Sequence, residues 1–147
     1  MWAVSPPQLE GAIAALAEEF SGVFAREAVA DCVVGSYELL QPARIPDFLP
    51  LLAHRFARER LRAAARAEGR QEGQVPSVLF VCTHNAGRSQ LAAALLMNLA
   101  GERIEVTSAG SRPGHAVAPE VVTALAEIDL EASALFPKPI TDEVIRG

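Results

Sequence analysis

The chain has 147 residues, of which 50% are apolar and 21% are charged, and its formal net charge is −5. This composition excludes a disordered charged tail, because such segments lack the apolar surface that offsets the loss of chain entropy on folding. The acidic balance gives no reason to expect nucleic acid as the main partner. Apolar runs stay below the roughly 18 residues that cross a bilayer, and the N-terminus shows no secretory pattern, so we expect no membrane association.

Residues 1–70 show helical periodicity. Apolar residues recur at spacings that place them on one face of a helix. In the first two predicted helices these residues are Leu9, Ile13, Leu16 and Phe20, followed by Val29, Val33, Tyr37 and Leu40. A third predicted helix begins near residues 47–50 and ends at Gly69. We therefore predict a compact three-helix bundle over residues 1–70.

The third predicted helix is rich in arginine. Its six arginines are Arg55, Arg58, Arg60, Arg62, Arg66 and Arg70. We interpret them as a solvated helix face, and the alternative is a docking surface for an anionic partner. The bundle also offers a route to a homodimer.

Cysteine and histidine usage limits the kinds of site that we expect. Cys32 and Cys82 are the only cysteines, too few for a disulfide framework, so we expect a reducing, cytoplasmic compartment. Cys32 lies on the apolar stripe of the second predicted helix and is predicted to be a small buried side chain, with a resolving thiol as the alternative. His54 and His115 lack metal-ligand spacing, so we predict no metal site. His115 follows the second predicted strand, where lining the cleft is a further alternative.

The second half of the chain changes period. Residues 71–76 are predicted to be a linker, because they are polar and contain glycine and proline. Residues 78–81 form a continuous apolar run, typical of a strand buried on both faces in a parallel sheet. A loop, a helix over about 89–100, an alternating strand nearer an edge at 103–108 and a helix from Pro119 follow. This order predicts the opening of a doubly wound α/β domain over residues 77–147.

The loop between the first predicted strand and its helix carries the chemistry. Cys82 ends the strand, and Arg88 lies where the helix begins, the position at which α/β folds bind ligands. Backbone N–H groups of such a loop form a cradle for phosphate-like ions. The same groups favour a thiolate over a thiol, which makes Cys82 a predicted nucleophile.

Each further residue of the loop has an expected part in the cradle. Arg88 offers a planar fork for two oxygens of a tetrahedral anion. Ala86 and Gly87 leave room for close approach, and Gly87 permits a positive φ. Asn85 tolerates the left-handed region and can hold the loop, and Ser89 can donate to the sulfur. His84 is interpreted as an exposed loop residue, with tuning of substrate access as the alternative. The predicted oxyanion-binding residues are Thr83, His84, Asn85, Ala86, Gly87 and Arg88.

The sequence from Val78 to Ala92 resembles the low-molecular-weight protein tyrosine phosphatase superfamily, and within it the arsenate reductase branch. The resemblance continues through residues 108–110, 128–130 and the Phe-Pro-Lys-Pro segment at 136–139. It covers about residues 77–145, and the helical half resembles an extension found on some actinobacterial members. The implied fold is a three-helix bundle joined to a truncated, doubly wound, parallel-sheet phosphatase-like domain.

The resemblance implies that Cys82 attacks arsenate and that Arg88 and the loop amides hold the adduct. A second thiol then releases arsenite. Thioredoxin-coupled relatives carry resolving cysteines in the same chain, whereas no cysteine follows Cys82 here. We therefore expect no resident cofactor and an external small thiol, such as mycothiol with a mycoredoxin, with glutathione-type coupling as the alternative.

Two other functions stay open. The first is a phosphatase acting on phosphotyrosine or small phosphoesters, because phosphoryl transfer needs the same cradle. Against it, Gly87 stands where the phosphatase branch usually has a second cysteine. The other is a non-catalytic fragment whose helical half serves dimerisation or docking.

The superfamily's general-acid aspartate lies near the C-terminus, after two further strands, and Asp142 does not match it. We therefore expect residues 77–147 to be the N-terminal half of the domain, either truncated or completed by a partner or a domain swap. A chain extended by about 60 residues, enough for two strand–helix units, is predicted to turn over arsenate faster than this chain in a steady-state assay. Equal turnover would contradict that expectation.

Overall fold

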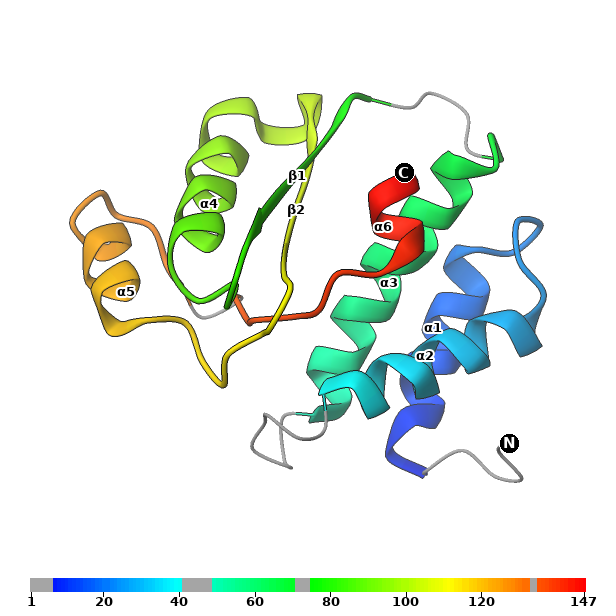
Figure 1. The fold of residues 1–147 in the computed structure, drawn as a ribbon. Coiled ribbons are helices and arrows are strands. Elements are labelled where there is room, and N and C mark those ends of the chain that lie inside the picture. The colour runs from blue at the N-terminus through cyan, green and yellow to red at the C-terminus, as the bar shows by residue number, and fades with distance from the viewer. Residues whose placement is uncertain (1–6, 41–48, 71–74, 133–134) are drawn as a thin grey trace. The chain divides into compact units, whose positions relative to one another are not determined.

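The computed structural model describes residues 7–40, 49–70, 75–132 and 135–147. The chain divides into two compact units (Figure 1). The first comprises Met1–Glu72 with Arg146–Gly147, and the second comprises Gly73–Ile145. Most of the predicted linker, at 71–74, lies outside the described residues.

The first unit consists of helices. A short 3₁₀ turn, η1 (Pro7–Leu9), leads into α1 (Glu10–Glu19), and α2 (Arg26–Leu40) and α3 (Leu49–Ala67) follow. The predicted apolar stripes are confirmed, because their members are buried together with residues of α3, although Tyr37 is only partly buried. The buried core comprises Leu9, Ile13, Leu16, Phe20, Val29, Val33, Val34, Ala53, Ala57 and Leu61. The predicted start of the third helix at 47–48 lies outside the described residues.

Arginines of the third helix bond within this unit as well as facing solvent. Arg58 Nε donates to both carboxylate oxygens of Glu19 at 2.9 Å, and Arg62 lies 3.8 Å from the same carboxylate. Other arginines donate to groups elsewhere in the unit. Within α3, these bonds join Arg60 to Ser36 Oγ and Arg66 to the Gly147 carbonyl. Arg70, which lies beyond the end of α3 rather than in the helix as predicted, donates to the Val23 carbonyl. The arginine-rich face therefore connects α3 to the other elements of the first unit.

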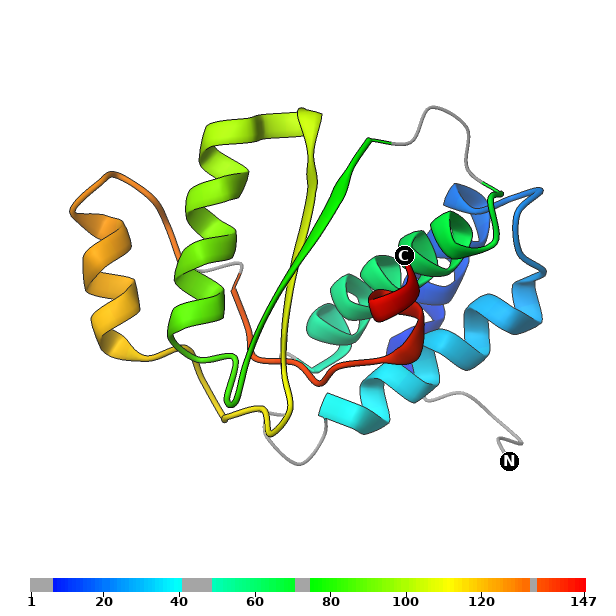
Figure 2. The same ribbon diagram turned by 45° about the horizontal axis from the view of Figure 1, so that its top comes forward.

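The second unit is a small α/β layer structure. It contains β1 (Ser77–Cys82), α4 (Arg88–Ala100), the 3₁₀ turn η4 (Gly101–Arg103), β2 (Glu105–Gly110), α5 (Pro119–Ala126) and all but the last residue of α6 (Asp142–Arg146). The strands β1 and β2 are parallel, with Ser77 opposite Glu105 and Cys82 opposite Gly110. Helix α4 lies between the sheet and α5 in both ribbon views (Figures 1 and 2). This arrangement confirms the mixed α/β class and the parallel pairing, because a parallel pair requires a crossover such as α4.

The observed burial of the two strands is the reverse of the burial that the sequence predicts. β1 is only partly buried, and Val81 is 51% exposed, whereas residues 106–110 of β2 are all buried. The segment around residues 138–140 pairs with the end of β2. Gly110 donates its N–H to the Lys138 carbonyl at 2.9 Å and accepts from the Ile140 N–H at 3.3 Å. β2 therefore has a neighbour on each side, while β1 pairs with β2 alone in the part of the chain that the structure describes. The predictions of a fully buried first strand and an edge second strand are wrong.

Within the described ranges, no helix combines the length and the apolar character needed to cross a bilayer.

Replacing Glu19 tests the ion pair of the first unit. We expect Glu19→Gln to lower the free energy of unfolding by about 0.5 to 1 kcal/mol near pH 7, because solvent screens this partly exposed pair. The hydrogen bond from Arg58 is the main cause that lowers the pKa of Glu19 on folding, against an opposing effect of burial. Its stabilisation is therefore full above the ordinary glutamate pKa of about 4.3. It is lost as the pH falls through the lower pKa of the folded state.

Urea unfolding of the wild type and the variant at pH 7 and at about pH 3 measures this loss. Glu18→Gln, on the exposed face of the same helix, is the matched control and is expected to change little. An undiminished difference for Glu19→Gln at the lower pH would contradict the assignment.

Candidate active site

The predicted nucleophile lies where two parallel strands end. Cys82 is the last residue of β1, directly opposite Gly110 at the end of β2, and Arg88 is the first residue of α4. Residues 83–87 form the loop between them. The carboxyl edge of the sheet and the amino end of a helix therefore meet at Cys82, which is the usual ligand position in an α/β fold.

The loop's carbonyl groups are held from outside by the segment that follows β2. Its backbone N–H groups donate to carbonyls of the loop at 2.7 to 3.2 Å. The pairs are Ser111 with Cys82, Arg112 with Thr83, Gly114 with His84 and Ala118 with Ala86. Because the C=O and N–H of one peptide unit point in opposite directions, these bonds turn the loop's N–H groups toward its interior. This gives the predicted oxyanion cradle a structural cause.

The sulfur of Cys82 is surrounded by donors. Ser89 Oγ lies 2.9 Å from Cys82 Sγ, and the N–H groups of Ser89 and Asn85 also bond to the sulfur. Burial acts to raise the pKa of the thiol, but these hydrogen bonds and the charge of Arg88 together lower the pKa below its ordinary value. A thiolate at neutral pH is the form that attacks an electrophile.

Asn85 orients the serine for this role. It is fully buried with a left-handed φ of 50°, and its Nδ2 donates to Ser89 Oγ at 2.7 Å. Because Ser89 accepts that bond, its own hydrogen is available to the Cys82 sulfur. The expectation that Asn85 adopts the left-handed region is confirmed. The sequence analysis notes that Gly87 permits a positive φ, but its φ in the structure is −131°. A Cβ atom placed at Gly87 would meet nothing within 4 Å. Gly87 therefore leaves open space at the loop.

Gln90 is a buried residue of the site that the sequence analysis did not single out. Its Nε2 lies 2.9 Å from the Asn85 carbonyl, 3.1 Å from Asn85 Oδ1 and 2.8 Å from the Phe136 carbonyl. It is 1% exposed, in the first turn of α4. A polar residue on a helix face that packs against a sheet is the signal that could have indicated it. Its amide connects the loop to the segment at 136–138.

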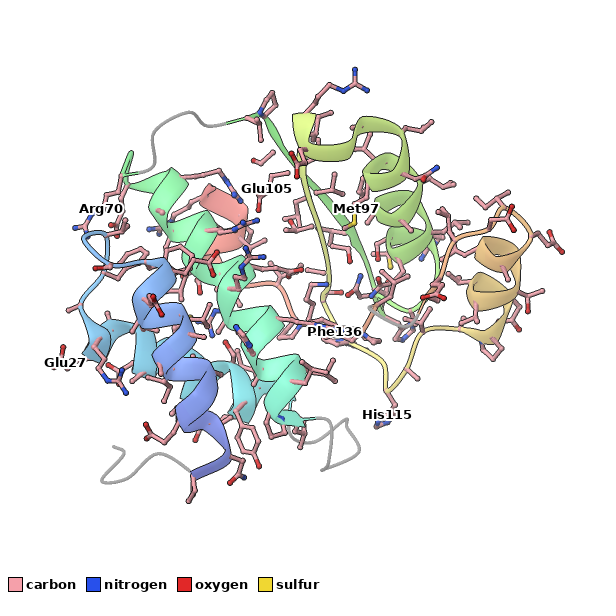
Figure 3. All side chains as sticks on the ribbon, turned by 180° about the vertical axis from the view of Figure 1, so that it is seen from behind. Glu27, Arg70, Met97, Glu105, His115 and Phe136 are labelled. Atoms are coloured by element: carbon pink, nitrogen blue, oxygen red, sulfur yellow. The ribbon has the colours of Figure 1, made fainter. Side chains whose placement is uncertain are left out.

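The other predicted site residues differ in their exposure to solvent. Thr83, His84 and Arg88 are exposed, whereas Ser89 is buried. His115 is also exposed, and its side chain points away from the second unit (Figure 3).

Outside the loop, Cys32 is a partly buried thiol in the first unit, with its Sγ 3.8 Å from the Ala57 carbonyl. Among the described residues, no group of three or more His, Cys, Asp or Glu side chains could hold a metal ion.

Gly110 provides a test of the loop's packing. A Cβ atom there would lie 2.8 Å from the Thr83 carbonyl oxygen and 2.9 Å from the Asn85 N and Cβ atoms. We expect Gly110→Ala to displace the loop and to slow alkylation of Cys82 at neutral pH by at least about tenfold, with loss of inorganic phosphate binding. Mass spectrometry of the Cys82 peptide after iodoacetamide treatment measures the rate.

Gly114→Ala is the matched control. A Cβ atom there would make ordinary contacts at 3.7 to 3.8 Å with Ala86 and His84, so the rate should stay within about twofold of wild type. Equal effects of the two substitutions would contradict the assigned role of Gly110.

Comparison with known proteins agrees with this geometry. Residues 9–65 match the family model of the protein-tyrosine-phosphatase-like N-terminal domain, and residues 77–147 match that of the low molecular weight phosphotyrosine protein phosphatases. The chain is also similar to the solved structure of the thioredoxin-dependent arsenate reductase Cg_ArsC1′ from Corynebacterium glutamicum, with 47% identity and a TM-score of 0.87. That match covers 94% of this chain and 70% of the Corynebacterium chain.

The resemblance seen in the sequence, to the arsenate reductase branch with an N-terminal helical extension, is thereby confirmed. The chain belongs to the low molecular weight phosphotyrosine protein phosphatase family and carries that family's phosphatase-like N-terminal domain.

Proposed function

We propose that this protein is an arsenate reductase in which Cys82 is the nucleophile. The observation that carries the proposal is the set of donors on the Cys82 sulfur, from the hydroxyl of Ser89 at 2.9 Å and from the N–H groups of Ser89 and Asn85. They favour the thiolate at the base of an anion-binding loop. The similarity to the Corynebacterium arsenate reductase supports arsenate as the anion.

In the proposed first step, the Cys82 thiolate attacks the arsenic of arsenate, and one arsenate oxygen leaves as water after protonation. Arsenic stays pentavalent in this thiol–arsenate adduct. The inward N–H groups of residues 83–87 and the guanidinium of Arg88 hold its oxygens. Ser89, which donates to the sulfur, stabilises the thiolate before the attack and after its release.

In the second step, an external thiol attacks the Cys82 sulfur. The sulfur–arsenic bond breaks, and its electron pair goes to arsenic, which leaves as trivalent arsenite. The two sulfurs form a disulfide, so the two thiols together supply the two electrons. A further thiol then reduces this disulfide and regenerates Cys82.

The source of the second thiol is part of the proposal. Cys32 is the only other cysteine of the chain, and its packing against the Ala57 carbonyl fits the interpretation as a buried side chain. The name of the similar reductase makes thioredoxin the first donor to test, followed by mycothiol with a mycoredoxin, which suits the resemblance to actinobacterial members. A thiol-dependent reaction also requires a reducing compartment, so a cytoplasmic location belongs to the same proposal.

Phosphatase activity is the second candidate function. Residues 77–147 match the model of the phosphotyrosine phosphatases, and a cradle for arsenate also fits the tetrahedral phosphate of an ester. The two candidates differ in the fate of the covalent adduct. Water attacks the phosphorus of a cysteinyl phosphate, whereas a thiol attacks the sulfur of a cysteinyl arsenate.

One comparison separates the candidates. Wild type, Cys82→Ser and Cys32→Ser are assayed for arsenite formation with each thiol system and for hydrolysis of an aryl phosphate. We expect arsenite formation by the wild type and Cys32→Ser alike, and its loss in Cys82→Ser, because only Cys82 lies in the loop. Loss in Cys32→Ser would instead make Cys32 the resolving thiol.

Hydrolysis that depends on Cys82, without arsenite formation, would replace the reductase proposal with the phosphatase. If the wild type showed neither activity, the result would favour the non-catalytic docking fragment.

A further inference from the structure

Lys138 is the only lysine in the sequence, and its side chain is buried, with 6% exposure. Burial of an ammonium group costs free energy unless neighbouring groups compensate for the lost water. Here the Nζ atom lies 3.5 Å from Ser108 Oγ on β2 and 4.7 Å from the centroid of the Phe136 ring. A hydroxyl acceptor and an aromatic face therefore hold the charge in place.

The backbone of the same residue joins two parts of the active site. Its N–H donates to Asn85 Oδ1 at 3.1 Å, and its carbonyl accepts from the Gly110 N–H at 2.9 Å. Side chain and backbone of Lys138 thus contact both β2 and the nucleophile loop. Asn85 Oδ1 also accepts a hydrogen bond from Gln90 Nε2 at 3.1 Å. The same Gln90 amide donates to the Phe136 carbonyl at 2.8 Å.

Asn85 needs such support. A left-handed residue other than glycine costs on the order of 1 kcal/mol and persists where surrounding bonds determine it. The support matters for chemistry because the Asn85 N–H bonds to the Cys82 sulfur and its Nδ2 orients Ser89. The charge of Arg88 also lowers the pKa of Cys82, whereas the contact of Lys138 with this network is made to Asn85.

We propose that Lys138 is a positioning residue: its buried side chain anchors the segment at 136–139 to β2, and through Asn85 this segment keeps Cys82 in its attacking form. The inference rests on the proposed function only in taking Cys82 as the nucleophile. It does not depend on which anion Cys82 attacks.

The test measures the iodoacetamide alkylation rate of Cys82 in the full chain as a function of pH, by mass spectrometry of the Cys82 peptide. Lys138→Met keeps an apolar stem but removes the charge and the donor. We expect its rate at pH 7 to fall about 3- to 10-fold, with the alkylation midpoint shifted to higher pH. Its melting temperature should stay unchanged or rise, because an apolar side chain of similar volume replaces a buried charge. A merely structural role would lower the melting temperature without moving the midpoint.

A double-mutant cycle with Asn85→Ala tests the route. If Lys138 acts through Asn85, adding Lys138→Met to Asn85→Ala should change the rate by less than about twofold. Additive effects, or a midpoint unchanged in Lys138→Met, would overturn the inference. Arg103→Met removes an exposed cation of the same unit that bonds the Ala100 carbonyl, and as a control it should leave the midpoint unchanged.

Ser108→Ala is a second variant that keeps Lys138 in place, in case Lys138→Met misfolds. It removes the hydroxyl that lies 3.5 Å from the ammonium group. It should move the midpoint in the same direction with a smaller loss of rate, and no shift would count against the inference. Alkylation is measured without arsenate, so absence of arsenite formation would refute the proposed function while leaving this test valid.

Discussion

The hydrogen bonds of Asn85 are the interaction on which the site depends. This one buried side chain donates to Ser89 and accepts from Gln90 and from the backbone of Lys138. Its main chain is left-handed, which turns its N–H toward the Cys82 sulfur. A strained residue is stable only where several bonds determine its conformation, and here those bonds come from α4 and from the segment beside β2. The hydrogen bonds on the Cys82 sulfur are therefore linked to contacts of residues far along the chain.

The C=O groups and the N–H groups of the same loop point in different directions and have different roles. Its carbonyls accept from the N–H groups of residues 111–118, which leaves its own N–H groups to the interior. The division requires the end of β2 to approach the loop closely, and Gly110 permits this because a side chain would collide with Thr83 and Asn85. Close packing of two backbones is thus what directs the N–H groups of the proposed anion site inward.

The sequence predicts the local features of this protein well. Helical spacing identifies the stripes from Leu9 to Leu40, and the position of Cys82 between a strand and a helix identifies the loop. Asn85 is correctly expected in the left-handed region because its side chain tolerates it. These features depend on residues close in sequence, where periodicity and turn chemistry are informative.

Features that depend on distant contacts are not predictable in this way. The second neighbour of β2, which bonds to Gly110 at its end, comes from residues 138–140. Gly110 and Lys138 enter the sequence analysis only within a resemblance, because their roles exist only once the strands are paired. Gln90 is missed for a related reason. Its bond to the Phe136 carbonyl joins residues 46 positions apart, and no local pattern reports such a contact.

The loop alone does not distinguish arsenate from phosphate, since both are tetrahedral anions that present the same oxygens to the same donors. The distinction lies in the central atom. Pentavalent arsenic accepts an electron pair when its bond to sulfur breaks and becomes trivalent. Phosphorus keeps its oxidation state, and attack by water releases it from the sulfur as phosphate. Discrimination between the two reactions therefore depends on which nucleophile reaches the adduct, a thiol or a water molecule. In the proposed reaction, groups that admit or exclude a thiol at Cys82, rather than the donors of the loop, therefore decide between arsenate reduction and phosphate release.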